Sequence, residues 1–371
     1  MTAARAPQVV LACDFFLRYT SLLAGGLARA GAGVTLLSRD HELEFGGRTG
    51  AAAAFVDAAV TADVKRRLLP GRVRSPRGAA AALRTRAAIG REAPDFVHLQ
   101  AGIGNDPRLV LASRARRGRF ALTIHDPVRH PGESTSRSAR VGNRLLVRTA
   151  GLIFVHAEAL RDELLEAVHP RAPVVVVPHG VEPAATQPLP PRPRILFFGR
   201  LDHYKGLDVL LDAMDEVWKA VPEAGLTVAG AGELDDHPAL GDRRVTARVE
   251  HIPDREVPDL FAAATCVALP YRQASQSGVG SLAKRYGRPL VVTRLGGLPE
   301  LVDDGSGLTV SPQHPAELAE ALIAVLTDRA LAERMGAAGA RAAEDRSGWT
   351  AVAEATLRAY EEHLPRRAGR G

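Results

Sequence analysis

Apolar, strand-like runs alternate with helical stretches along the whole chain, and this alternation constrains the fold more than any other feature. Segments such as 21–30 and 157–168 have a helical period between such runs. Continuous apolar strands separated by helices are typical of parallel sheets that are covered on both faces. The sequence therefore predicts an α/β, doubly wound fold. In the first half we expect strands at residues 8–13, 33–38, 55–60, 96–100, 120–125, 152–156 and 174–178.

The same pattern then starts again, which predicts a second domain of the same kind. Between the two series, residues 182–193 contain five prolines, which neither a helix interior nor a central strand accepts. We therefore expect a Rossmann-like domain at 1–184, a linker at 185–193 and a second Rossmann-like domain at 194–346. The helical tail at 347–371 is expected to pack near the first domain. Strands of the second series are expected at 194–198, 226–229, 245–250, 266–269, 290–293 and 308–310.

Charge is distributed unevenly between the halves. The 371-residue chain has a net charge of +6, with +10 in residues 1–184 and −4 in residues 185–371. A basic half favours an anionic acceptor or an anionic lipid surface, and peripheral membrane contact stays open beside the simpler interpretation of a solvated face. No motif for nucleic-acid recognition is present, so we expect no nucleic-acid partner. The arginines that contribute most are Arg114, Arg116, Arg117, Arg119, Arg137, Arg140, Arg144 and Arg148.

Several features point to a cytoplasmic protein without a metal. No apolar run reaches the roughly 20 residues of a membrane span, and no signal-peptide core follows Met1. Cys13 and Cys266 both lie in apolar runs, where core thiols are expected rather than a disulfide. No Cys/His cluster has zinc spacing, and no Asp-x-Asp pair is found. We expect neither a metal nor a cofactor.

The turn after the strand at 194–198 is a candidate phosphate site. Gly199 ends the strand, Arg200 follows at once, and Lys205 and Gly206 precede a helix with apolar positions from Leu207 onward. Two fixed cations at a strand tip beside a helix N-terminus suit a diphosphate, because lysine supplies a point charge and arginine a two-pronged donor. The alternative is an ordinary turn with solvated charges.

Polar residues follow other strands at the same expected edge, where ligands of doubly wound sheets bind. His125 and Asp126 end the strand at 120–125 and are candidate catalytic residues. Alternatively, Asp126 forms a turn with Pro127 and His125 only satisfies backbone groups. The stretch 273–280 leads through small polar residues into a helix, whose bare amides could hold a phosphate. Gly296 and Gly297 allow a close backbone approach or simply a turn.

Taken together, these segments resemble the retaining glycosyltransferases of family four (glycosyltransferase group 1), which have the GT-B fold. The resemblance is specific over residues 120–310 and loose over 1–95. It implies a sugar transferase that uses a nucleotide-diphosphate sugar as co-substrate and acts without a metal on a small-molecule, glycan or lipid-linked acceptor. The segments that carry it are Thr123–Asp126, Val177–Val181, Phe198–Leu201, Tyr204–Leu207, Val228–Glu233, Leu269–Tyr271, Ser275–Gly278, Gly287–Thr293 and Gly296–Glu300.

The resemblance also implies roles for individual residues. Arg200 and Lys205, with Gly199 and Gly206 around them, would bind the donor diphosphate. The amides near Ser277, Gly278 and Val279 would bind its distal phosphate. His251, Ile252 and Pro253 would lie against the nucleobase, and His125 would line the sugar site.

Two places depart from the family's pattern. Where the family has two glutamates, for the donor sugar and the ribose, this chain has Ala274 and Leu282. Part of that role could pass to Gln273, Ser275 or Gln276, or to Ser277. In place of a glycine-rich turn after the first strand stands 14–20, whose Arg18, Tyr19 or Thr20 could approach the phosphate or the acceptor.

Three interpretations of function stay open on the sequence. The favoured one is an active retaining glycosyltransferase. A catalytically silent homologue that binds a sugar nucleotide or supports a partner enzyme would explain Ala274 and Leu282. A nucleotide-sugar epimerase of the same fold would need catalytic carboxylates that the sequence does not offer.

Overall fold

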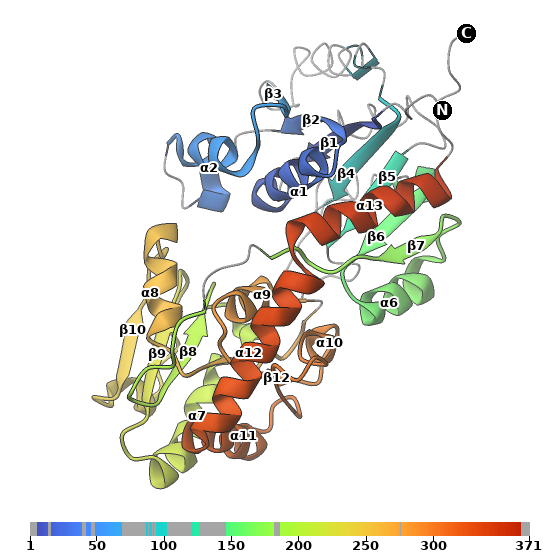
Figure 1. Ribbon diagram of the computed structural model, residues 1–371. Coiled ribbons are helices and arrows are strands. Elements are labelled where there is room, and N and C mark those ends of the chain that lie inside the picture. Colours follow the sequence, from blue (N-terminus) through green and yellow to red (C-terminus); the bar gives the residue numbers. More distant parts are fainter. Residues whose placement is uncertain are drawn as a thin grey trace. The chain divides into compact units, whose positions relative to one another are not determined.

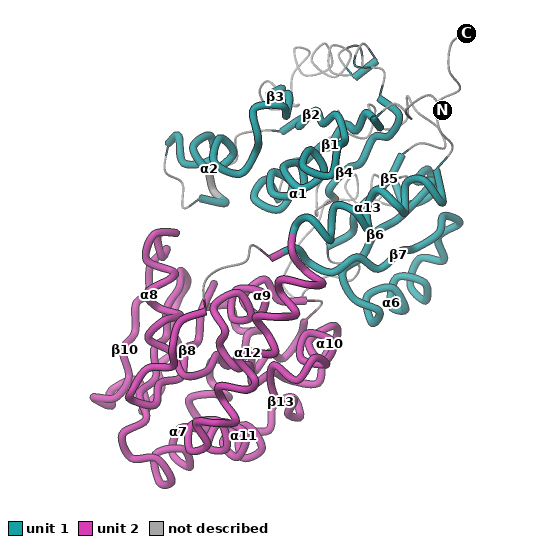
Figure 2. Tube along the Cα trace, viewed as in Figure 1, with its two compact units in different colours: residues 1–180, 349–371 teal, residues 181–348 magenta. Residues whose placement is uncertain are grey.

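The computed structural model describes residues 6–13, 16–38, 42–45, 49–68, 87, 89–90, 92, 94–101, 120–125, 146–181, 186–274 and 276–364. The chain divides into two compact units (Figure 2). The first comprises Met1–Gly180 and Trp349–Gly371, and the second comprises Val181–Gly348. The chain therefore leaves the first unit near Gly180 and returns to it through the C-terminal helix.

The first unit is built on a parallel sheet of seven strands with helices around it (Figure 1). The strand order is β3-β2-β1-β4-β5-β6-β7. Its strands are β1 (Gln8–Cys13), β2 (Gly33–Ser38), β3 (Lys65–Leu68), β4 (Phe96–Ala101), β5 (Phe120–Ile124), β6 (Leu152–Val155) and β7 (Val174–Val176). Its described helices are α1 (Leu17–Arg29), η1 (Glu42–Phe45), α2 (Ala51–Ala59), α6 (Glu158–Val168) and α13 (Trp349–His363).

The second unit repeats the design with a six-stranded parallel sheet in the order β10-β9-β8-β11-β12-β13. Its strands are β8 (Arg194–Phe198), β9 (Gly225–Ala229), β10 (Val245–Arg248), β11 (Cys266–Leu269), β12 (Leu290–Thr293) and β13 (Gly307–Val310). Its α-helices are α7 (Leu207–Ala220), α8 (Val257–Ala262), α9 (Gly278–Arg285), α10 (Leu298–Leu301), α11 (Pro315–Thr327) and α12 (Arg329–Asp345). Its 3-10 helices are η2 (His203–Lys205), η3 (Pro238–Gly241) and η4 (Asp254–Glu256).

Both faces of each sheet are buried, as the apolar strands predict. In β1, Val9 and Leu11 pack into the core on the side of α1 and α13, whereas Val10 and Ala12 pack into the core on the side of α6. Successive strand residues point to opposite faces, so a strand that is apolar throughout must lie between two helical layers. The predicted α/β, doubly wound fold is confirmed.

The predicted strand at 55–60 is wrong, because these residues belong mainly to α2. Four alanines precede Phe55, and alanine has the highest helix propensity. The buried positions Ala52 and Val56 are four residues apart, which is the spacing of one helix face. The edge strand is instead β3, which pairs with β2 and begins with Lys65, Arg66 and Arg67. Charged residues of this kind are common on edge strands.

Residues 186–193 of the proline-rich stretch, which was expected to be a linker, pack against the second unit. Leu189 is buried in that unit's core. The buried Arg288 guanidinium donates hydrogen bonds to the carbonyl oxygens of Gln187 at 2.8 Å and Pro188 at 3.3 Å. Arg329 donates to the carbonyl oxygen of Leu189 at 3.1 Å. These carbonyls satisfy two arginines, and the prolines need no backbone partner for their nitrogen.

No helix in the described ranges combines the length and the apolar character that a membrane span requires.

Candidate functional site

The loop after β8 holds Lys205 in an unusual environment. Gly199 has φ +104 and Gly206 has φ +68, so both ends of the loop use left-handed backbone that favours glycine. The Lys205 side chain turns back into the loop, where its Nζ lies 5.3 Å from the centre of the Tyr271 ring. A Cβ atom at Gly199 would lie 2.6 Å from that Nζ. Glycine at 199 therefore leaves the space that the ammonium group occupies.

Burial changes the acid–base character of this ammonium group. Lys205 is 6% exposed. Burial first, and then the neighbouring Arg200, lowers the pKa of Lys205 to about 8, while Asp202 acts in the opposite direction. Within the described part of the chain, no carboxylate forms an ion pair with its Nζ. A nearly buried cation without a paired anion favours binding of an anionic ligand.

Arg200 lies at the open side of the same loop. Its side chain is 68% exposed, with Nη1 3.1 Å from Asp202 Oδ2 and Nη2 donating to the Tyr204 hydroxyl at 3.4 Å. An exposed ion pair of this kind is worth about 1 kcal/mol or less, so the guanidinium can exchange Asp202 for a ligand at little cost.

The N-terminus of α9 lies beside the loop after β8. Val279 Cγ2 is 3.3 Å from the place where a Cβ of Gly199 would stand. Ser277 caps this helix, because its Oγ accepts the amide of Gly280 at 3.3 Å, and it lies 3.2 Å from the Tyr271 hydroxyl. The structure thus brings Gly199, Lys205 and the start of α9 together, as the sequence predicts for a phosphate site. The Ser277 hydroxyl itself is used by the cap.

The remaining candidates of the second unit lie at residues 251–253 and on the loop before α9. His251 is exposed, Pro253 is half-buried before η4, and Ile252 is 6% exposed within the core. On the loop before α9, Gln273 is exposed and Gln276 is half-buried, whereas Ser275 lies outside the described residues. Contacts of these residues with a nucleobase, ribose or sugar stay predictions.

In the first unit, His125 lies at the carboxyl end of β5 within a cluster of rings. It is 1% exposed. Phe16 stacks on its ring at 3.9 Å between centroids, and the edge of Tyr19 lies 4.9 Å away. Its Nε2 is 3.0 Å from Gln100 Oε1. Burial lowers the pKa of His125 well below its usual value, so the ring is neutral near pH 7. Asp126 lies outside the described residues.

Two further histidines, which the sequence analysis did not select as site residues, complete this cluster. The ring of His156 lies 4.9 Å from that of His125, and the ring of His179 lies 5.3 Å from that of His156. Tyr19 and Trp349 close the cluster at 5.1 Å from each other. His156 follows β6 and His179 follows β7, so the rule that selected His125 at a strand end applies to both.

The three N-terminal candidates differ in their surroundings. Tyr19 packs against His125, as described above. Arg18 lies over the rings of Phe45 and Phe55, at 4.8 and 4.5 Å. The Thr20 hydroxyl is buried and donates to the Phe16 carbonyl oxygen at 2.7 Å.

A carboxylate of this chain already caps α1. The Glu44 oxygens accept the amides of Leu17 at 2.8 Å and Arg18 at 3.0 Å. The first two amides of α1 are therefore satisfied from within the protein.

Comparisons with known proteins identify the family of this chain. Residues 18–185 match the family described as Glycosyltransferase Family 4, and residues 192–328 match Glycosyl transferases group 1. The chain is 30% identical over 287 residues to a glycogen synthase of Mycobacterium tuberculosis, which covers 72% of this chain and 68% of that protein. The chain belongs to the family 4 glycosyltransferases.

This family-4 glycosyltransferase is also similar to another curated protein and to two solved structures. A D-inositol 3-phosphate glycosyltransferase of Corynebacterium jeikeium is 32% identical over 264 residues, covering 63% of this chain and 62% of that protein. Sucrose-phosphate synthase from Thermosynechococcus elongatus superposes with a TM-score of 0.73 at 18% identity, over 96% of this chain and 98% of that chain. HepE of Anabaena in complex with UDP-glucose superposes with a TM-score of 0.70 at 17% identity, over 96% of this chain and 99% of that chain. These structures confirm the predicted GT-B fold.

Ala274 and Leu282 stand where the resemblance predicts glutamates, and the structure shows how these two residues pack. Both are half-buried and pack against the core formed around Leu196 and Phe261. Neither side chain can accept a hydrogen bond.

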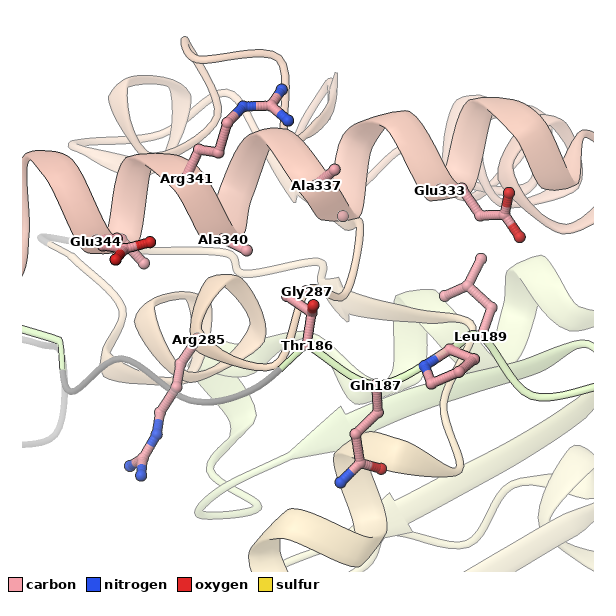
Figure 3. Close-up of a pocket in the computed structure, with 13 residues that line it drawn as sticks. Thr186, Gln187, Leu189, Arg285, Gly287, Glu333, Ala337, Ala340, Arg341 and Glu344 are labelled. Carbon is pink, nitrogen blue, oxygen red and sulfur yellow. The ribbon is translucent and has the colours of Figure 1, made fainter.

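A separate cavity of about 680 Å³ lies in the second unit between α12 and residues 186–189 (Figure 3). Small residues of α12, such as Ala337 and Ala340, form one wall, and Arg285 and Gln187 line the opposite side. None of the predicted donor-site residues lines this cavity. We therefore do not assign it to the donor.

Proposed function

We propose that this protein is a retaining, metal-independent glycosyltransferase that moves a sugar from a nucleotide-diphosphate donor to an acceptor hydroxyl. The observation that carries the proposal is the buried Lys205 ammonium beside Gly199 and the N-terminus of α9. This group, with Arg200, supplies positive charge where a departing diphosphate needs it. Family membership supports the same assignment.

In the proposed reaction, the bond between the anomeric carbon and the diphosphate oxygen breaks. The acceptor oxygen bonds to that carbon on the same face of the sugar, and its proton passes to the departing phosphate oxygen. Lys205 and Arg200 stabilise the charge that develops on the diphosphate, which is the role that a metal plays elsewhere. His125 contributes to the sugar side of the transfer. A cytoplasmic location fits Cys13 and Cys266, which are both buried and form no disulfide.

The decisive experiment measures donor binding to Lys205→Ala and Arg200→Ala by calorimetry, after a screen of UDP, GDP, ADP and TDP sugars. Each variant loses a charge-assisted hydrogen bond to the donor, so its affinity for the donor should fall about ten- to a hundredfold. Lys219→Ala is the matched control, because Lys219 is exposed on α7 and pairs with Glu216. Unchanged affinity in a folded Lys205→Ala, Arg200→Ala double variant would remove this site from the proposal.

Turnover with the identified donor should survive EDTA, because Lys205 and Arg200 already provide fixed cations for the leaving group. Loss of turnover with EDTA that magnesium or manganese restores would contradict metal independence. Donor binding that depends on Lys205 without any sugar transfer would instead favour the silent homologue, which Ala274 and Leu282 also favour.

A further inference from the structure

A chain of buried polar side chains leads to His125 from the interior of the first unit. His125 Nε2 lies 3.0 Å from Gln100 Oε1, and Gln100 Nε2 lies 3.3 Å from His98 Nε2. Beyond His98, the chain ends at Tyr360 of α13, whose hydroxyl lies 2.6 Å from His98 Nδ1. His98, Gln100 and His125 are each 1% exposed. Water is therefore excluded from these contacts, and the atoms that form them depend on one another for their hydrogen bonds.

The Gln100 side-chain amide connects the two imidazoles, because one end of an amide only accepts hydrogen bonds and the other end only donates them. Oε1 faces His125, so His125 Nε2 must carry the proton. Nε2 of the amide faces His98, so His98 Nε2 must be bare. In this tautomer the Thr123 hydroxyl, 2.7 Å away, and the more distant Gln100 amide share the one lone pair of His98 Nε2, and His98 Nδ1–H donates to the Tyr360 hydroxyl at 2.6 Å.

Both imidazole rings are neutral, as this pattern of donors and acceptors requires. Burial lowers the pKa of His98 to about 3 and that of His125 well below its usual value, so both rings are neutral near pH 7. A neutral imidazole has one donor and one acceptor nitrogen. Because Nε2 of His125 is the donor, Nδ1 is the acceptor. Among the described residues, this buried Nδ1 has no hydrogen-bond partner.

We propose that Gln100 is a positioning residue that holds His125 as the Nε2–H tautomer, so that Nδ1 accepts a hydrogen bond from a hydroxyl group of the transferred sugar. The part that concerns the sugar rests on the proposed function, whereas the tautomer does not. A donor that lacks this hydroxyl leaves the buried nitrogen unsatisfied, and such a site discriminates strongly against it. The substrate class is therefore a sugar with a free hydroxyl that faces His125, rather than the corresponding deoxy sugar.

The test is ¹⁵N NMR of the protein labelled at the histidine ring nitrogens, near pH 7.5 and without a substrate. His125 signals are assigned by their loss in His125→Ala. In the parent protein, Nε2 should show the shift of a protonated nitrogen and Nδ1 that of a bare one. Gln100→Met removes the amide at similar volume and should abolish this fixed pattern. Thr123→Val is the matched control, because it removes a neighbour of His98 but keeps the amide between the rings.

Kinetics then test the positioning role. Gln100→Met should lower kcat about tenfold while the KM for the donor changes little, since the diphosphate contacts lie in the second unit. A protonated Nδ1 in the parent protein would show the reversed amide orientation and overturn the inference. So would an unchanged His125 pattern in folded Gln100→Met. If the pattern is as expected but no sugar transfer is found, the proposed function fails and the tautomer stands.

Discussion

At the scale of single residues, burial makes Lys205 lose its proton at a lower pH than an exposed lysine does. Its pKa is about 8, lowered mainly by burial. Below about pH 8 the ligand-free protein already carries the ammonium form, so donor affinity should not depend on pH. Above about pH 8 binding must be coupled to proton uptake, because a diphosphate favours the charged form. Calorimetry should therefore show affinity falling up to about tenfold for each further pH unit.

Lys205→Arg is the control for this dependence, because a guanidinium stays protonated through the same range. Its affinity can differ from that of the parent, but its slope between about pH 8 and 9.5 should be nearly flat. Titration of the nucleobase affects both proteins equally and cancels in the comparison. Equal slopes for the two proteins would show that Lys205 is not the group that titrates.

The sequence predicted the surroundings of a site residue only where these surroundings are local. Gly199 and Lys205 lie six residues apart in one turn, so their contact can be expected from the motif alone. The surroundings of His125 are not local, because Gln100 and Trp349 come from β4 and α13. No spacing in the sequence shows that His156 and His179 meet in one ring cluster, although each follows a strand.

At the scale of elements, the packing of α13 depends on a close approach to α1. This helix packs on α1 where Gly26 allows close approach, since a Cβ at Gly26 would lie 2.5 Å from the carbonyl oxygen of Trp349. Backbone cannot yield as a flexible side chain can. Gly26→Ala should therefore lower the free energy of unfolding by about 1–3 kcal/mol, despite the better helix propensity of alanine.

Chemical denaturation followed by circular dichroism measures this effect. Gly241→Ala is the matched control, because a Cβ there would meet nothing within 4 Å and its backbone is not left-handed. This control should change stability by a few tenths of a kcal/mol. A Gly26→Ala protein as stable as the control would show that α1 and α13 tolerate a wider separation.

The elements show where a pattern predicts structure and where packing decides. β1 and β8 were predictable because an apolar run fits only a strand that is buried on both faces. α2 was mistaken because Phe55 and Val56 are common in strands, while the four alanines before them favour a helix. The strand β3 was missed because Lys65, Arg66 and Arg67 give it no apolar pattern, although it pairs with β2.

At the scale of the whole molecule, each unit has its own core and its own buried tryptophan. Trp349 lies in the first unit and Trp218 in the second, and the chain has no others. The units also differ in their buried titratable groups. His98 and His125 are buried in the first unit, whereas the described histidines of the second unit are half-buried or exposed. The two units should therefore respond differently to acid.

The sign of this response follows from the direction of the pKa shifts. His98 and His179 have their pKa lowered to about 3 and His125 well below 6.5, mainly by burial, whereas all three titrate near 6.5 when the chain is unfolded. The stability of the neutral folded form is complete above about pH 6.5. It falls as the pH decreases, because only the unfolded state takes up the protons.

Each of these three histidines should lower the free energy of unfolding by about 1.4 kcal/mol per pH unit below 6.5, so the first unit should lose about 4 kcal/mol at pH 5.5. Urea unfolding at about pH 7.5 and 5.5, followed by tryptophan fluorescence, separates the units. Trp218→Phe leaves Trp349 to report on the first unit, and Trp349→Phe leaves Trp218 to report on the second. Most carboxylates stay ionised over this range, so the second unit should change little. Equal losses in both units would contradict the assignment of the acid response to His98, His125 and His179.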